Sequence, residues 1–386
     1  MPKSRDSTTS PAAQPLDTYN AEWAIFAEEF KPIQALPSTM HVNFEIEDDV
    51  GGRHPADASY DIIIDHLQKA RLHMAHSKDF VVALFFTLWE CLKKFRDFRI
   101  ALQQRHGVEL SHELVQSFVA SPTGPTCVNK NLVKAGQRAV WGAVNNKGAA
   151  RSGDDEIYMS RNLIDAIRRL ASASASAQLG LGAQVVQQKL NELLLIFYVT
   201  VFQETSNSAT KHFFGPELFG SYDSDGAGES GHRLEYALLE ASLQAWTPKD
   251  TINDQDCLLN ISHLVFKKGP QAKVLDTTQI QFMVDSFRRT RIWPVQFDRL
   301  QALPASVNLN SHDRLWETPE PAAPMDGGDG GVEAALRESG HEPIETDCLR
   351  DVNSAAESSV APEPNAAVES NVGLGPNTVP PGYRRY

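Results

Sequence analysis

The sequence has few of the features that mark a secreted, disulfide-stabilised or membrane-spanning protein. Its 386 residues include four cysteines, and none is spaced as the CxxC pair of a zinc or redox site. No apolar run follows the first residues, so we expect no signal peptide. The longest apolar runs, at 80–92 and 193–202, are shorter than the roughly 20 residues of a membrane helix. We therefore expect an intracellular protein with reduced thiols and no membrane span.

Motifs for catalysis, cofactors and metals are also missing. The GxSxG, HExxH and P-loop patterns do not occur, and the Gly-Leu-Gly stretch at 180–182 lacks the third glycine of a dinucleotide loop. The acidic loop that begins at Asp223 has Leu234 where a calcium loop needs a carboxylate. We predict a protein that is not an enzyme and that has no cofactor and no metal.

The net charge of −13 is concentrated at the two ends of the chain. Residues 305–386 hold 14 acidic and 5 basic residues, and residues 1–60 hold 10 and 4. The middle of the chain has 25 acidic and 27 basic residues, a net charge of +2. A nearly neutral middle leaves room for a basic groove, although the whole chain is acidic.

Apolar residues recur at steps of three and four along most of the chain, which predicts amphipathic helices. A short alternating stretch at 41–47 predicts a strand. The predicted helices cover residues 20–36, 61–74, 80–104, 111–119, 128–145, 154–170, 183–203, 232–246, 255–266 and 277–291.

The predicted fold class is therefore mainly α, a two-lobed helical domain with an N-terminal arm and a disordered C-terminal tail. The alternating Ser/Ala run at 172–177 is expected to be a hinge between the lobes. The tail is rich in Pro, Gly, Ala, Ser and Glu and lacks the apolar residues that would offset the entropy of ordering. The predicted parts are a disordered N-terminus (1–19), the arm (20–60), two helical lobes (61–171 and 178–303) and the tail (304–386).

Clustered basic residues make nucleic acid a candidate ligand. A groove lined with them would bind phosphates by charge and bases by stacking, without reading the sequence. The alternative is that they are ordinary solvated helix faces. In one cluster, at 93–99, basic residues alternate with two phenylalanines. The candidate RNA-binding residues are Lys130, Lys134 and Arg138, spaced for one face of a helix, Arg161, Arg168 and Arg169, Lys267 and Lys268, and Arg288, Arg289 and Arg291.

Aromatic side chains on the predicted arm form a possible contact with another copy of the chain. Trp23, Phe26 and Phe30 share one helical face, and aromatic anchors often carry most of the binding energy of an interface. We expect oligomerisation through these residues. The alternative is that the same face packs on the chain's own core.

This layout of arm, two helical lobes and acidic tail resembles that of the nucleoproteins of negative-strand RNA viruses. The resemblance implies a homo-oligomer that encloses single-stranded RNA in a basic cleft, in the virion and the host cytoplasm. It also implies terminal arms that exchange between subunits and a tail that recruits a polymerase or cofactor protein. The helical coat proteins of flexuous viruses are the next most similar class.

A cellular scaffold or adaptor is the alternative from another class of protein. Its helical core would bind one protein partner, and its tail would carry linear motifs. The two classes differ in what accompanies the purified protein, because only a nucleoprotein or coat protein is expected to carry RNA.

Overall fold

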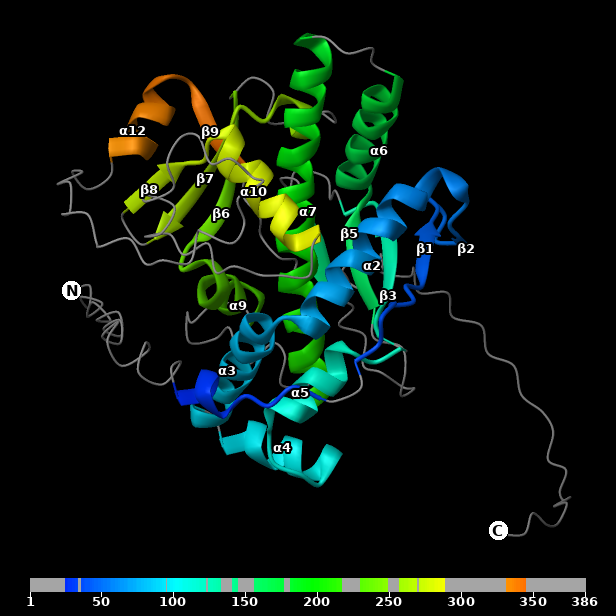
Figure 1. Ribbon diagram of the computed structural model, residues 1–386, viewed down its shortest axis with the longest axis vertical. Helices are drawn as coiled ribbons and strands as arrows, with labels where there is room; N and C mark the ends of the chain where they lie inside the picture. The colour runs from blue at the N-terminus through cyan, green and yellow to red at the C-terminus, as the bar shows by residue number, and fades with distance from the viewer. Residues whose placement is uncertain are drawn as a thin grey trace, which may run out of the picture. The chain divides into compact units, whose positions relative to one another are not determined.

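The described part of the chain is mostly helical, as the sequence predicts, but it also contains two β-sheets (Figure 1). The sequence predicted only one strand, at 41–47, and no sheet. The computed structural model describes residues 25–33, 36–94, 96–122, 124–132, 141–144, 156–176, 181–216, 230–248, 257–268, 271–288 and 331–344. All of them belong to one unit that extends from Met1 to Val352.

The helices form where apolar residues recur with helical spacing. Residues 25–29 are helical, and the main helices are α2 (Asp61–His76), α3 (Lys78–Lys94), α4 (Arg96–His106), α5 (His112–Val119), α6 (Arg161–Ser176), α7 (Leu181–Phe214), α9 (Ser230–Leu239), α10 (Thr277–Arg288) and α12 (Gly331–Glu338). Two short 3-10 turns, η1 (Ala58–Tyr60) and η4 (Cys257–Asn260), connect elements. The Ser111 side chain caps α5 by accepting from the backbone N–H of Leu114.

The first sheet has a parallel centre. It contains β1 (Phe44–Glu47), β2 (Arg53–Pro55), β3 (Thr126–Lys130), β4 (Gly142–Val144) and β5 (Glu156–Ser160), in the order β2-β1-β3-β5-β4. Strands β1, β3 and β5 run parallel, and β2 and β4 are antiparallel edges. The chain between β1 and β3 forms α2 to α5, the long crossover that parallel strands require.

This sheet confirms the strand predicted at 41–47 and corrects two predicted helices. Residues 128–145 begin in β3 and contain β4, and residues 154–170 begin in β5 before α6 starts. Strands β3 and β5 are short, and each pairs with a strand far away in sequence, as where Val128 lies opposite Tyr158. Helical spacing in the sequence does not reveal such pairing.

The second sheet is antiparallel and includes a segment of the predicted tail. It contains β6 (Ser242–Pro248), β7 (His263–Lys268), β8 (Gln271–Val274) and β9 (His341–Ile344), in the order β8-β7-β6-β9. The helices predicted at 232–246 and 255–266 are therefore wrong in their second halves, which form β6 and β7.

The predicted tail is wrong as a wholly disordered segment, because residues 331–344 form α12 and β9. Strand β9 pairs with β6 from Ala245 opposite Ile344 to Pro248 opposite His341. Leu336 of α12 is buried against Trp246 and Val265. Figure 1 shows α12 beside this sheet, where it covers the face that carries Trp246.

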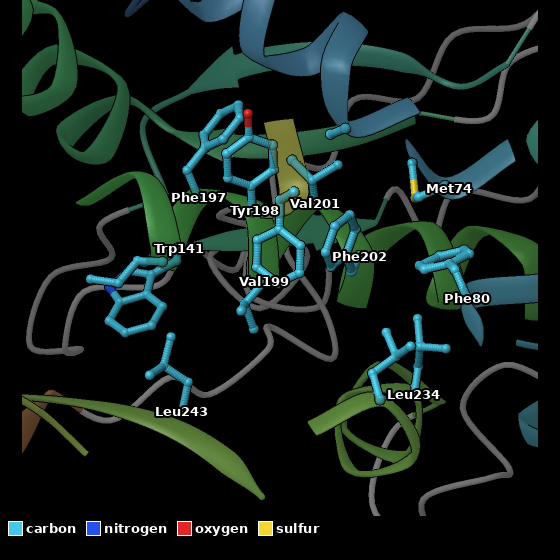
Figure 2. Packing of buried hydrophobic residues seen from close by; sticks show 14 of the residues in the cluster. Met74, Phe80, Trp141, Phe197, Tyr198, Val199, Val201, Phe202, Leu234 and Leu243 are labelled. Carbon is cyan, nitrogen blue, oxygen red and sulfur yellow. The ribbon is translucent and has the colours of Figure 1, made fainter. Parts of the chain in front are cut away.

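Helix α7 is the centre of the core. Its residues 190–211 are buried on every side, which is typical of a helix enclosed by other elements. Figure 2 shows Phe197, Tyr198 and Phe202 of this helix among side chains from α3, α9 and β6. By length and apolar composition α7 would be able to cross a membrane, but 72 % of its most apolar window is buried inside the structure.

The two predicted lobes share this core, which corrects the predicted hinge. One continuous cluster joins apolar residues from both sides of the Ser/Ala run, for example Leu163 and Phe197. The run itself is helical through Ser176 at the end of α6. Helices α6 and α7 lie side by side in Figure 1.

The second half of α7 is polar and nevertheless buried. The Asn207 side-chain oxygen accepts hydrogen bonds from the Ser230 hydroxyl and the Gly231 backbone N–H, both at 2.8 Å, and so caps the start of α9. Glu235 of α9 accepts from the Gln203 amide at 2.7 Å. These bonds satisfy polar groups that burial would otherwise penalise by several kcal/mol, so the helix continues to Phe214 instead of ending at the predicted residue 203.

A buried arginine fastens the loop that precedes β3. Arg71 of α2 donates hydrogen bonds to the backbone oxygens of His41 and Ser121. The guanidinium passes against Gly124, where an added Cβ would lie 1.9 Å from the Arg71 Nη2 atom. Glycine is therefore required at position 124 by close approach.

We expect Gly124→Ala to destabilise the chain by about 1–3 kcal/mol, because the new methyl group forces Arg71 away from its two carbonyl partners. Chemical denaturation measures this effect. Gly182→Ala is the matched control, since nothing lies within 4 Å of its Cβ and alanine favours a helix over glycine. An equal or smaller loss for Gly124→Ala than for Gly182→Ala would contradict the proposed role of Arg71.

Candidate nucleic-acid interface

Lys130, the first candidate RNA-binding residue, ends strand β3 and is engaged within the chain. Its ammonium lies 2.8 Å from the Glu47 carboxylate and 4.6 Å from the centre of the Tyr158 ring. Arg53 contacts Glu47 as well and pairs with Glu156. The hydrogen bond with Glu156 raises the pKa of Arg53. This side of the sheet therefore carries compensated charge instead of a free basic surface.

The prediction that Lys130, Lys134 and Arg138 share one helical face is wrong for Lys130, because this residue lies in a strand. The other two residues lie outside the described part of the chain, as do Arg289 and Arg291.

Two arginines of α6 hold that helix against the segment around β1 and η1. Arg161 lies 2.5 Å from the Asp49 carboxylate. Arg168 pairs with Asp165 at 3.1 Å and stacks 3.8 Å above the Tyr60 ring. These contacts fit a structural role, because bound phosphate would have to compete with them. Arg169 is exposed on the same helix.

The candidate cations of the second predicted lobe also have acidic partners. Lys267 contacts Glu333 of α12 at 2.7 Å, and Lys268 contacts Glu240 at 3.3 Å. Arg288 lies 3.6 Å from Asp285, one turn earlier on α10. The described members of the predicted cleft are thus largely neutralised by nearby carboxylates.

The arginines of α4 differ from these candidates because they are not neutralised by nearby carboxylates of the described residues. Arg96, Arg99 and Arg105 are exposed, and none of them forms an ion pair with a carboxylate in the part of the chain that the structure describes. Arg99 donates from Nε to the Leu92 backbone oxygen at 2.7 Å, which holds it at the end of α3. Lys93 of α3 lies 4.7 Å from the centre of the Trp89 ring.

Three buried apolar residues fix α4 to the core. Phe98 is buried, and its ring centre lies 4.8 Å from that of Phe214 at the end of α7. Ala101 and Leu102 are buried beside it. Phe98 is therefore a packing residue and not a platform for bases, while the arginines project from an anchored helix. Phe95 lies outside the described residues.

The predicted arm packs on the chain's own core. The Phe26 ring lies 5.0 Å from Phe85 and 5.1 Å from Trp89, and Phe30 lies 5.8 Å from His112. Phe26 and Phe30 therefore agree with the alternative stated above, in which this aromatic face packs on the chain's own core. Trp23 lies outside the described residues, and oligomerisation stays a prediction.

The described residues include no group of three or more metal-ligating side chains. The two best-formed cavities measure about 10 and 20 Å³, which is room for a single water at most. Cys91 and Cys127 are buried thiols, and burial raises the pKa of Cys127 to about 12, so its thiol stays protonated.

Comparison with known proteins adds no relative: no protein-family model, no curated protein and no solved structure matches the chain.

Proposed function

We propose that the protein is a non-enzymatic RNA-binding protein of the nucleoprotein or coat-protein kind. In this proposal it oligomerises and holds single-stranded RNA without sequence specificity, through the exposed arginines of α4. The supporting observation is that Arg96, Arg99 and Arg105 are exposed without carboxylate partners, whereas most of the other described candidates are paired. An unpaired arginine can displace the counterions of a phosphate without first losing an internal ion pair.

The surroundings of α4 are compatible with such a surface. The helix is anchored by Phe98, so its arginines keep their spacing when a strand binds. Ile100 and Val108 are exposed apolar side chains on α4 and just after it, and they offer a contact for a neighbouring copy on the same strand. Because phosphate contacts carry no sequence information, this surface would bind all RNA sequences alike.

We expect the triple variant Arg96→Gln, Arg99→Gln, Arg105→Gln to weaken binding to every RNA sequence by a similar factor. Each phosphate neutralised on a single strand adds about 0.7 to the slope of log affinity against log salt, so the slope should flatten by about 2. Fluorescence anisotropy with labelled poly-U and a mixed-sequence RNA, over a salt series, measures this change.

The control is the double variant Lys69→Gln, Lys78→Gln, which removes positive charge from α2 and α3 away from these arginines. Its salt slope should equal that of the unmodified protein. An equal slope for the α4 triple variant would show that RNA binds elsewhere. No binding by any form would favour the scaffold or adaptor, whose partner is a protein.

A further inference from the structure

Two histidines from distant parts of the chain meet at one end of the second sheet. His263 begins β7 and His341 begins β9, and the two strands flank β6. Their ring centres are 5.2 Å apart, with the ring planes at 86°. Both side chains are partly exposed, so solutes can reach them.

The hydrogen bonds around the pair determine which ring nitrogen carries the proton. The Ser339 hydroxyl donates to the Leu336 backbone oxygen at 2.9 Å, and the Ser339 Oγ atom also lies 2.9 Å from Nδ1 of His341. The Ser262 hydroxyl donates to the Trp246 backbone oxygen at 3.0 Å and lies 3.0 Å from Nδ1 of His263. A hydroxyl has one proton, so with that proton directed at the backbone oxygen the imidazole Nδ1–H is the donor in both contacts.

In this tautomer the lone pair of each imidazole lies on Nε2. This is the tautomer in which histidine binds a metal, and a hydrogen bond from the other ring nitrogen is the usual support of such a ligand. Burial, and then the neighbouring His341, lower the pKa of His263. On α7 nearby, Lys189 and Glu192 pair with each other at 2.6 Å, so neither presents an uncompensated charge.

We propose that His263 and His341 form a binding site for a divalent transition metal of the zinc class. Two imidazoles that share a tetrahedral metal at about 2.1 Å place their ring centres about 5 Å apart, in agreement with the observed spacing. The described residues supply no third ligand, so water completes the coordination and the metal exchanges with solution. This site is separate from α4 and does not depend on the proposed function.

Metal at this site would join β9 to β7 across β6. It would therefore hold residues 331–344 on the sheet, since His341 is the first residue of β9. A ligand that binds only the docked arrangement stabilises that arrangement by mass action.

Titration of the full-length protein with ZnCl₂ in a calorimeter tests the proposal. We expect one site in the unmodified protein, and loss of that site in His263→Gln and in His341→Gln. Ser339→Ala, which removes only the positioning hydrogen bond, should weaken binding by about 10- to 100-fold. His54→Gln, on strand β2 of the other sheet, is the matched control and should bind as the unmodified protein does.

Limited proteolysis supplies a second readout, which reports on the docking of residues 331–344 and not on the binding heat. Zn²⁺ should slow cleavage within residues 331–344 in the unmodified protein but not in His263→Gln. That substitution lies outside the protected segment, so it reports on the site even if His341→Gln loosens β9. Unchanged Zn²⁺ affinity in His263→Gln, or no single site in the unmodified protein, would overturn the proposal.

Discussion

A chain that ends at residue 330 should be less stable than the full-length protein by about 3 kcal/mol or more. It loses the burial of Leu336, worth about 1.5–3 kcal/mol, and the pairing of β9 with β6. Trp246, which is fully buried in the intact chain, loses part of its cover. Its fluorescence should therefore shift to longer wavelength at temperatures below the melting transition.

The control is a chain that ends at Val352, the last residue of the unit that contains α12 and β9. Its melting temperature should match that of the full-length protein. The point variant Leu336→Ala should reproduce a large part of the loss, about 2 kcal/mol. Equal melting temperatures for the chains ending at 330 and 352 would mean that residues 331–344 do not stabilise the fold.

Acidification from pH 6 to pH 4 should lower the free energy of unfolding steeply. Burial depresses the pKa of His66 to about 4 and that of His73 to about 3, whereas an unfolded histidine titrates near 6.5. The unfolded chain therefore binds more protons in this range, and stability is lost as the pH falls. Two such groups give a slope of about 2.7 kcal/mol per pH unit.

The surroundings of the two histidines explain these shifts. His66 lies 2.8 Å from the Tyr198 hydroxyl, and the charge of Arg288 also disfavours its protonation. Asp65 and Lys69, its neighbours on α2, act in opposite directions. His73 stacks on Phe202, and neither of its ring nitrogens has a hydrogen-bond partner among the described residues.

His73→Leu tests this account, because leucine fills a similar volume without a polar atom. We expect the variant to flatten the pH dependence by about 1.4 kcal/mol per pH unit. Urea denaturation at a series of pH values measures the slope, and His41→Gln, at an exposed position, should leave it unchanged. The same slope in His73→Leu as in the unmodified protein would show that His73 is not buried as a neutral group.

The helices with strong local signals could be predicted from the sequence. The first part of α7 was predicted as the helix 183–203, although its apolar run at 193–202 alone would also suit a strand, and α10 was predicted within the helix 277–291. The polar half of α7 could not be predicted as buried. Its burial depends on Asn207 and Gln203 meeting residues of α9, 23 and 32 positions away.

The strands other than β1 were missed for a related reason. Strand β3 and strand β9 have five and four residues, and each exists because of a partner strand distant in sequence. The segment His341–Ile344 contains a proline and lies in an acidic, glycine-rich region, which by composition favours disorder. Its pairing with β6 and the burial of Leu336 of α12 against Trp246 show why it is ordered.

For the candidate interface, the sequence gives positions of charge but not their partners. Lys130 and Arg161 look equivalent to Arg96 in the sequence, yet the structure pairs the first two with Glu47 and Asp49. Clustering of basic residues thus predicts a phosphate-binding surface only after internal ion pairs are known.

The most direct test of the proposed function is a titration of RNA-free protein into labelled poly-U at low salt, followed by fluorescence anisotropy. The account predicts saturable binding of similar strength to poly-U and to mixed-sequence RNA, which weakens steeply as salt is added. The absence of binding at low salt would contradict it.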